Sequence, residues 1–287
     1  MTLLEAVNVW KHFGATVALA NVSLSLDRGL HVVAGPNGSG KTTLLKIWSG
    51  LLRPSRGRVR VLNLDPWLQK TSLLKRVHVA FEDIQLPWWV SGLEYLRFVA
   101  ASRGVNWGGV LEIAEMLEIT GYWAKLIRGY SSGMRKRVLL AQALIGEPEI
   151  IILDEPYTLL DVKAVRVLHE VMRGKLKGEA TVVIATHILT EFEDEATTLT
   201  VLRNGSVQRH YRENDMREKA SIVCYDKETA RMIAEASLDG VSKVIVKDGK
   251  VIVEAEAVVP LERVSNCKTM LSIGELYEEA LHSEGGV

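Results

Sequence analysis

The sequence contains very little cysteine, since Cys224 and Cys267 are the only two among 287 residues. Two cysteines are too few for a disulfide scaffold, and their separation does not match the spacing of metal ligands. We therefore expect both thiols to be reduced, as is usual for a cytoplasmic protein.

An excess of charge of one sign is also lacking, because 35 lysines and arginines are balanced by 35 aspartates and glutamates. Proteins that bind DNA or RNA generally carry a strong basic field toward the phosphate backbone. The neutral balance argues against this class, and we expect no nucleic-acid partner. The hydrophobic share of 47% and the charged share of 24% are those of an ordinary globular protein.

Long hydrophobic runs are missing as well. The longest stretch without Asp, Glu, Lys or Arg extends from His12 to Leu26, and asparagine and serine residues interrupt it. A membrane-spanning helix needs about 18 or more apolar residues in a row. Residues 1–5 have neither the basic nor the apolar region of a signal peptide. We expect a chain that does not span a membrane by itself.

The most informative stretch that is present is a glycine-rich loop with the pattern Gly-x-x-x-x-Gly-Lys-Ser/Thr, which is typical of loops that wrap nucleotide phosphates. Glycines let successive backbone N–H groups point at one anion. The Lys41 ammonium adds positive charge at the β- and γ-phosphates, and the Thr42 hydroxyl can bind Mg²⁺. A buried strand at 30–34 precedes the loop and a helix at 42–48 follows it, so the helix N-terminus faces the phosphates. The alternative is a glycine-rich surface turn. The loop residues are Gly35, Pro36, Asn37, Gly38, Ser39, Gly40, Lys41, Thr42 and Thr43.

A second informative stretch is the apolar run 150–153, which is followed by Asp154 and Glu155. Such a run suits a parallel strand that is buried on both faces, and two carboxylates at its end need a partner. Ligands of open α/β sheets bind at the carboxyl ends of the strands, where Asp154 can hold Mg²⁺. Glu155 can polarise an attacking water. The alternative is a solvated acidic turn.

Three further positions have two interpretations each. His187 follows another buried strand and is either a structural histidine or a polar sensor of the ligand. Ser131 or Ser132 caps a helix predicted at 135–145, either as a plain cap or as part of a second anion site. Phe13 either stacks on a base or packs in the core.

The periodicity of the chain indicates a larger domain at 1–207. Residues 1–30 alternate between apolar and polar positions, which predicts an antiparallel sheet at the edge of the domain. Helical periodicity in the segment 87–145 predicts a helical insertion, in which Ser91 and Glu94 form a capping box.

A smaller α+β domain is predicted at 220–287, after a polar linker at 208–219. It has no cluster of catalytic residue types, so regulation, dimerisation or partner docking is the role we expect. Its predicted elements are a strand at 221–225, a helix at 227–237, a hairpin of strands 243–246 and 250–253, and a helix at 273–281.

Together, these motifs resemble those of the ATP-binding subunits of ABC transporters, over roughly residues 1–207. The resemblance rests on the order of the motifs more than on any one of them. The segments that match the family motifs are the Walker A loop at 35–42, the signature motif at 131–134, the Walker B strand at 151–155, the D-loop at 158–161 with Asp161, the switch histidine His187 and the adenine-stacking aromatic Phe13.

The chain departs from the family pattern in three places. The signature is Tyr130-Ser131-Ser132-Gly133-Met134 instead of Leu-Ser-Gly-Gly-Gln, a form similar to that of exporter subunits. It keeps Ser131 and Gly133, which contact the γ-phosphate in the family. Glu82 stands in place of the Gln-loop glutamine, where it would join the Mg²⁺ shell through water, and Gln85 follows three positions later. The D-loop reads Thr158-Leu159-Leu160-Asp161 instead of Ser-x-Leu-Asp.

The resemblance implies an α/β fold with a P-loop NTPase core, an antiparallel β edge and a helical insertion. It also implies a mechanism in which two nucleotide-binding subunits, of the same or of different chains, close head to tail over two ATP molecules. Each ATP lies between the Walker motifs of one subunit and Ser131 and Gly133 of the other. Glu155 acts as general base and His187 orients water, while Lys41 and Mg²⁺ stabilise charge in the transition state.

A transmembrane permease subunit is the further partner that the resemblance implies, with this chain peripheral on the cytoplasmic face of the membrane. In the family, the permease docks beside the Gln-loop, where Trp88 and Trp89 fall. These tryptophans are either an exposed hot spot or part of the core of the insertion. Two other functions are an ATP-gated dimerisation clamp and a soluble ABC protein of translation or DNA repair. Glu155 and His187 favour turnover over a clamp, and the second class generally needs two cassettes in one chain or a long coiled-coil insertion.

Overall fold

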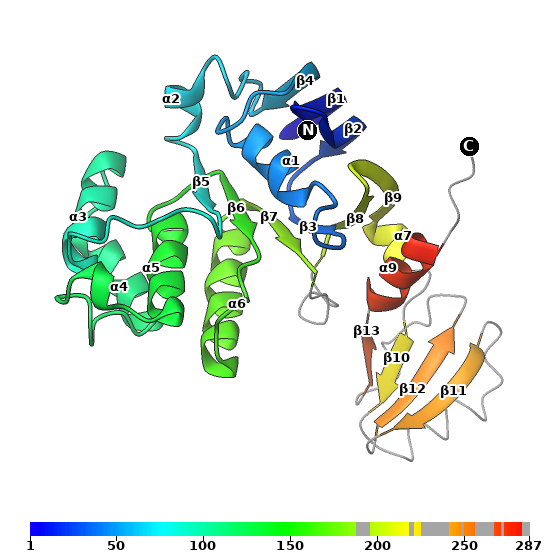
Figure 1. Ribbon diagram of the computed structural model, residues 1–287. Helices are drawn as coiled ribbons and strands as arrows, with labels where there is room; N and C mark the ends of the chain where they lie inside the picture. The colour runs from blue at the N-terminus through cyan, green and yellow to red at the C-terminus, as the bar shows by residue number, and fades with distance from the viewer. Residues whose placement is uncertain are drawn as a thin grey trace. The chain divides into compact units, whose positions relative to one another are not determined.

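The structure of the protein is a computed structural model that describes residues 1–187, 196–217, 221–224, 241–247, 250–255, 267–270 and 273–282. The chain divides into two compact units. The first consists of Met1–His187 and Leu202–Val207, and the second of Ile188–Val201 and Gln208–Val287. Figure 1 labels the elements of both units.

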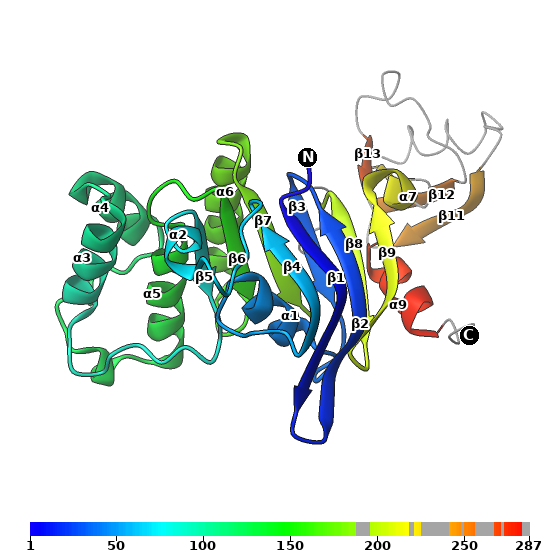
Figure 2. The same cartoon turned by 90° about the horizontal axis from the view of Figure 1, so that it is seen from above.

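The first unit begins with an antiparallel sheet of three strands in the order β2-β1-β4. Strands β1 (Leu4–Phe13) and β2 (Thr16–Leu26) form a long hairpin, which Figure 2 shows extending away from the helices, and β4 (Arg56–Val61) pairs with the other edge of β1. Alternate residues of β2 from Val22 to Leu26 are buried. The antiparallel edge predicted from this alternation is confirmed.

The second sheet has six strands in the order β5-β6-β7-β3-β8-β9. The last two strands are β8 (Thr198–Arg203) and β9 (Ser206–Arg212), of which the residues Leu202–Val207 belong to the first unit. The other four strands are buried at every position, as expected for parallel strands covered on both faces. They pair in parallel, so their carboxyl ends meet at one edge of the sheet. Their bounds are β3 (Leu30–Ala34), β5 (Val77–Ala80), β6 (Ile150–Asp154) and β7 (Thr181–Thr186).

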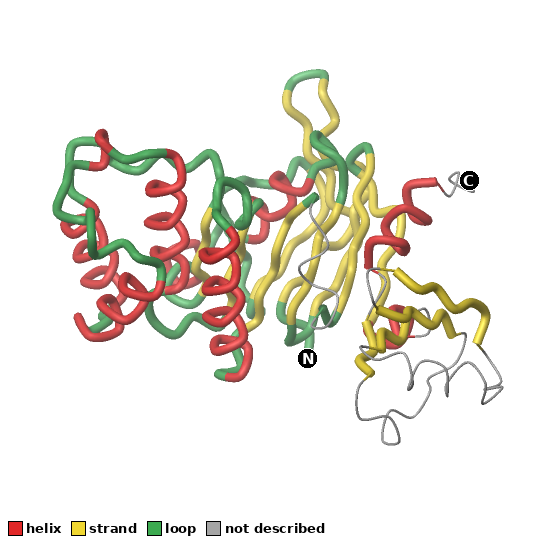
Figure 3. The backbone as a smooth tube through the Cα atoms, turned by 90° about the horizontal axis from the view of Figure 1, so that it is seen from below, coloured by secondary structure: helices red, strands yellow, loops and turns green. Residues whose placement is uncertain are grey.

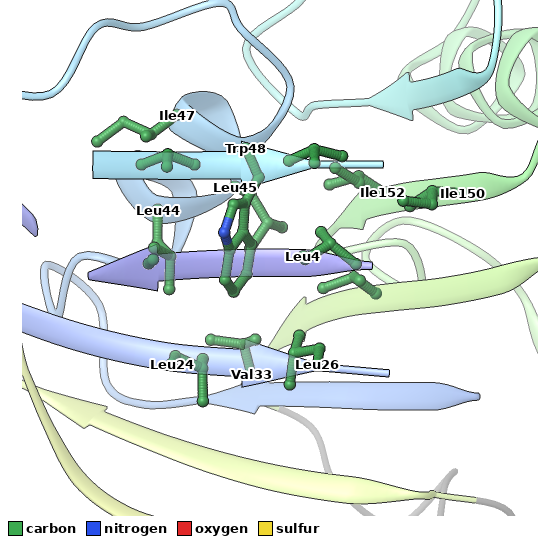
Figure 4. Packing of buried hydrophobic residues seen from close by; sticks show 14 of the residues in the cluster. Leu4, Leu24, Leu26, Val33, Leu44, Leu45, Ile47, Trp48, Ile150 and Ile152 are labelled. Carbon is green, nitrogen blue, oxygen red and sulfur yellow. The ribbon is translucent and has the colours of Figure 1, made fainter. Parts of the chain in front are cut away.

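Helix α1 (Lys41–Trp48) contributes to one hydrophobic core together with both sheets. Figure 4 shows the indole ring of Trp48 among leucine, isoleucine and valine side chains of this core. Trp48 is fully buried. Because the helix packs on two sheets at once, the loop that precedes it is held at a fixed place beside the strand ends.

The predicted helical insertion consists of α3 (Gly92–Arg103), α4 (Trp107–Met116) and α5 (Ser132–Leu144), with a short 3-10 turn η1 (Ile127–Gly129). Figure 3 shows these helices gathered to one side of the strands of the first unit. The predicted capping box is present, since the Ser91 hydroxyl accepts from the Glu94 amide and the Glu94 carboxylate accepts from the Ser91 amide. The remaining helices of the unit are α2 (Lys70–Leu73) and α6 (Val162–Lys177).

The second unit contains a four-stranded antiparallel sheet in the order β11-β12-β10-β13. The predicted hairpin is present as β11 (Val241–Lys247) and β12 (Lys250–Ala255), and the predicted strand as β10 (Ser221–Cys224). The predicted last helix is α9 (Ile273–His282), which buries Ile273, Leu276 and Ala280. Strand β13 (Cys267–Met270) has no counterpart in the sequence prediction.

The range 208–219, which the sequence predicts to be a linker, contains the end of β9 and helix α7 (Glu213–Arg217). Its polar composition does not indicate a strand, yet His210 lies in β9, where its Nδ1 is 2.9 Å from the hydroxyl of Thr200 in β8. The helix predicted at 227–237 lies outside the described residues. Within the part of the chain that is described, no helix is both long and apolar enough to cross a bilayer.

His78 in β5 is a buried histidine whose protonation is linked to folding. Its Nδ1 lies 3.2 Å from the carbonyl oxygen of Ala143 in α5. Burial lowers the pKa of His78 from 6.5 to about 3, and the positive charge of Arg103 adds to this effect. The ring is therefore neutral in the folded protein at neutral pH, and its Nδ1–H donates to the carbonyl.

We predict that the protein loses stability as the pH falls from 7.5 to 5, because His78 becomes protonated in the unfolded chain but stays neutral in the folded chain. The pKa of His78 is lower in the folded chain than in the unfolded chain. The contribution of His78 to the free energy of unfolding is therefore fully present above pH 6.5 and is lost as the pH falls toward 3. The contribution of this residue over pH 7.5 to 5 is about 2 kcal/mol. Urea unfolding of the wild type and of His78→Gln measures it. An equal pH dependence in both proteins would contradict the assignment.

Candidate functional site

The loop 35–43 joins the end of β3 to the start of α1 at the edge where the parallel strands end. Its tip at 36–38 is exposed. Gly40 caps α1 with φ +104°, and a Cβ there would lie 2.6 Å from the Ala18 carbonyl oxygen, so only glycine fits. The exposed tip and the helix N-terminus together offer backbone N–H groups to an anion.

Lys41 lies at the inner side of this loop and is buried. Its Nζ donates to the carbonyl oxygens of Gly35 at 2.7 Å and of Pro36 at 3.3 Å. The same atom lies 3.7 Å from Oε1 of Glu155. The ammonium group thus stands between the loop and the end of β6, where it can meet the negative charge of a phosphate.

Thr42 and Asp154 meet at the same edge, where the Thr42 hydroxyl donates to Oδ2 of Asp154 at 2.8 Å. The other oxygen, Oδ1, is buried and has no hydrogen-bond partner among the described residues. Burial raises the pKa of Asp154, against the effect of the Thr42 hydrogen bond. A hydroxyl beside an unsatisfied carboxylate oxygen is a donor set that suits Mg²⁺.

Glu155 follows directly and is held from several elements. Its Oε2 accepts from the Thr186 hydroxyl at 3.3 Å and lies 2.9 Å from Nδ1 of His187. Its backbone adopts φ +46°, a left-handed conformation that is uncommon outside glycine. This turn brings the carboxylate of Glu155, Lys41 and His187 together at the strand ends.

Helix α5 begins at the predicted signature motif. The Ser131 hydroxyl accepts from the Met134 amide and caps the helix. Ser132 is exposed in the first turn, and a Cβ on Gly133 would lie 3.1 Å from the carbonyl oxygen of Leu159. The signature and the predicted D-loop therefore approach each other closely.

The two remaining predicted residues lie at the ends of elements of the first unit, Asp161 before α6 and Phe13 at the end of β1. Asp161 caps α6 by accepting from the Ala164 amide at 2.8 Å, and it pairs with Arg137 of α5 at 2.7 Å. Phe13 ends β1 and is 50% exposed, which excludes the core alternative. Nζ of Lys11 lies 5.0 Å from the centre of its ring.

A groove of about 350 Å³ lies beside the end of β5, between the parallel sheet and the helical insertion. Trp88 and Trp89 are 59% and 63% exposed, which excludes the alternative that they fill the core. Their rings meet edge to face with centres 5.6 Å apart. The groove is lined by Glu82, Ile84, Gln85, Leu86, Trp88, Ser132, Arg135, Lys136, Leu139 and Leu159.

Two residues that the sequence analysis did not single out belong to this site. Thr186 ends β7 and donates to Glu155, and its position at the end of a buried strand is the signal that marks it. Lys136 of α5 donates to the carbonyl oxygen of Glu155 at 2.7 Å. The sequence signal that marks Lys136 is its place among the apolar residues of a helix face.

Comparison with known families matches residues 19–158 to the ABC transporter family. The chain is 33% identical over 202 residues to the daunorubicin resistance ATP-binding protein DrrA3 of Streptomyces coeruleorubidus. It is 32% identical over 210 residues to the ABC transporter ATP-binding protein YxlF of Bacillus subtilis (strain 168). These matches cover 69% and 71% of this chain, and 64% and 69% of the two relatives, so the chain spans slightly less than two thirds of the Streptomyces protein. The chain belongs to the ATP-binding proteins of the ABC transporter family.

Solved structures of the same family share the fold. An ATP-binding subunit of an ABC transporter superimposes with a TM-score of 0.69 at 26% identity, covering 75% of this chain and 92% of that one. A dimeric ATP-binding cassette in a post-hydrolysis state, bound to ADP and Pi, superimposes with a TM-score of 0.66 at 27% identity, covering 73% and 98%. The α/β fold with a P-loop NTPase core, expected from the sequence, is confirmed.

We predict that replacing Trp88 and Trp89 together with serine changes the free energy of unfolding by less than about 1 kcal/mol, because both side chains are exposed. The matched control is Trp48→Ala, which empties a fully buried site and costs about 3–5 kcal/mol. Urea denaturation measures both variants. A loss from the double variant as large as that from the control would mean that the exposed tryptophans are structural.

Proposed function

We propose that this chain is the ATP-hydrolysing motor subunit of an ABC transporter. The observation that carries the proposal is the placement of Glu155, whose carboxylate contacts His187 on one side and approaches Lys41 of the phosphate loop on the other. Since a loop that binds phosphate and a carboxylate suited to activate water share one sheet edge, the site supports cleavage of a phosphoanhydride bond.

ATP is bound through the loop 35–43, with Lys41 at the β- and γ-phosphates and Phe13 stacked on the adenine. The exposure of Phe13 is compatible with this role. Glu155 acts as the general base that takes a proton from the attacking water, and His187 keeps the carboxylate oriented. Lys41 stabilises the charge that develops on the transferred phosphoryl group.

Thr42 and Asp154 would hold Mg²⁺, and Glu82 would join them through water. The buried and unpartnered Oδ1 of Asp154 supports the first two assignments. When bound, the cation supplies positive charge that neutralises the phosphate oxygens. The chain's own residues provide the binding loop, the base and its orientation.

The complete site requires a second ATP-binding subunit. Ser131, Ser132 and Gly133 open α5, and we assign their backbone N–H groups to the γ-phosphate of ATP held by the other subunit, with Asp161 of the D-loop close by. The similarity to a dimeric cassette supports this arrangement. ATP then closes two subunits head to tail, and its hydrolysis lets them reopen.

A transmembrane permease is the second partner. The groove beside β5 is lined in part by Trp88, whose ring contacts that of Trp89, and it has the mixture of exposed aromatic and charged groups that suits a protein contact. We place the chain on the cytoplasmic face of the membrane and assign it to export, which the name of the relative in daunorubicin resistance supports. The second unit, which includes 220–287, serves as an accessory or regulatory domain.

The direct test is the Mg²⁺-dependent release of phosphate from ATP by the purified chain. We predict that Glu155→Gln lowers the rate roughly a hundredfold or more while ATP still binds, because the base is removed and the phosphate loop is untouched. Glu115→Gln, a matched change of an exposed glutamate in α4, keeps the wild-type rate.

Two results would contradict the proposal. A Glu155→Gln variant that hydrolyses ATP at the wild-type rate shows that Glu155 is not the base. A wild-type chain that binds ATP but releases no phosphate, alone or with its permease, points to a clamp instead of a motor.

A further inference from the structure

Lys136 is a buried cation that the proposed mechanism does not use. It lies in the second turn of α5 and is 6% exposed. Burial of an ammonium group removes its hydration, which is unfavourable unless hydrogen bonds and opposite charges compensate. Its partners therefore indicate why a lysine is placed here.

The hydrogen-bond partner of Lys136 is the backbone of the proposed base. Nζ donates to the carbonyl oxygen of Glu155 at 2.7 Å, and the amide of Glu155 donates to the carbonyl of Ala185 at 2.8 Å. Glu155 is held between these two bonds in its left-handed conformation. Since a residue other than glycine adopts this conformation at some cost, the bond from Lys136 helps to maintain the turn that presents the carboxylate.

The charge partners of Lys136 are carboxylates at the ends of two neighbouring strands, β5 and β6. Burial lowers the pKa of Lys136, and the negative charges of Glu82, Asp154 and Glu155 oppose this effect. Glu82 lines the same groove as Lys136 and follows the end of β5, which pairs in parallel with the strand that ends at Asp154. The same ammonium group thus lines the groove and contacts the backbone of the proposed base.

The position of Lys136 on α5 connects it to a third region. Gly133 is three residues earlier on the same helix, so the two residues share a helix face. Gly133 is also where α5 approaches the Leu159 carbonyl. A shift of the start of α5 would move Lys136 and, through its hydrogen bond, the backbone of Glu155.

We propose that Lys136 is a positioning residue for ATP hydrolysis, which fixes the turn at Glu155 and balances the negative charge of Glu82. Lys136 belongs to α5, its side chain lines the groove, and its ammonium group donates to the backbone of the proposed base. This inference rests on the proposed ATPase function.

The first test is Lys136→Gln in the full chain, with steady-state ATPase kinetics. We expect kcat to fall about tenfold or more, because a small displacement of the base is costly. KM for ATP stays within about twofold, since Lys136 contacts Glu155 and not the phosphate loop. Lys125→Gln, the same change at an exposed lysine of the insertion, leaves kcat unchanged. Thermal unfolding and binding of a fluorescent ATP analogue verify that each variant folds.

The second test repeats the substitution in a Glu82→Gln background. If Lys136 balances Glu82, the loss in kcat caused by Lys136→Gln becomes smaller by about threefold or more when the carboxylate is gone. A lysine that only supports the helix causes the same loss in both backgrounds.

The outcomes separate the two proposals. A Lys136→Gln variant with wild-type kcat overturns the positioning role, and an equal loss in both backgrounds overturns the pairing with Glu82. Absence of ATPase activity in the wild-type chain, both alone and with its permease, overturns the proposed function instead, and binding of the fluorescent analogue distinguishes that case from a misfolded preparation.

Discussion

Two carboxylates at the end of one buried strand impose the constraint that organises the first unit. Asp154 and Glu155 are 3% and 9% exposed, so their negative charges repel each other and have lost most of their hydration. Each surrounding element brings a donor or a cation to this point: the phosphate loop brings Lys41 and Thr42, the end of β7 brings Thr186 and His187, and α5 brings Lys136. The parallel register of the strands makes this convergence possible, because it aligns their carboxyl ends.

The same network accounts for how an ATP site can respond to distant events. The core around Trp48 fixes α1 and the phosphate loop against both sheets, whereas α5 belongs to the helical insertion. A change in the position of α5 therefore alters the contacts of Glu155 without displacing the loop 35–43, to which we assign the binding of phosphate. In the proposed function, this is the physical route by which a second subunit at the signature, or a permease at the groove, influences hydrolysis.

Most of the first unit follows from local sequence patterns. Buried strands, the glycine-rich loop and the Ser91 cap are each specified by a few adjacent residues, and the structure contains all of them. The exposure of Trp88 and Trp89 was not predictable, because it depends on how the insertion packs on the sheet. The end of strand β9 and helix α7 are not indicated by the sequence pattern, because their residues are mostly polar. Lys136 carried a readable signal, since it stands at helical spacing from the buried Leu140 and Ala143, but its partner is a backbone atom distant in sequence.

The measurement that tests the central claim most directly is size-exclusion chromatography with light scattering on the Glu155→Gln chain, with and without Mg·ATP. The account predicts a shift from the monomer mass to the dimer mass when ATP is added, because the altered signature of one copy completes the ATP site of the other and slow hydrolysis keeps the pair closed. A chain that binds ATP and still elutes at the monomer mass would contradict a site formed by two copies of this chain and would point to a different chain as the second ATP-binding subunit.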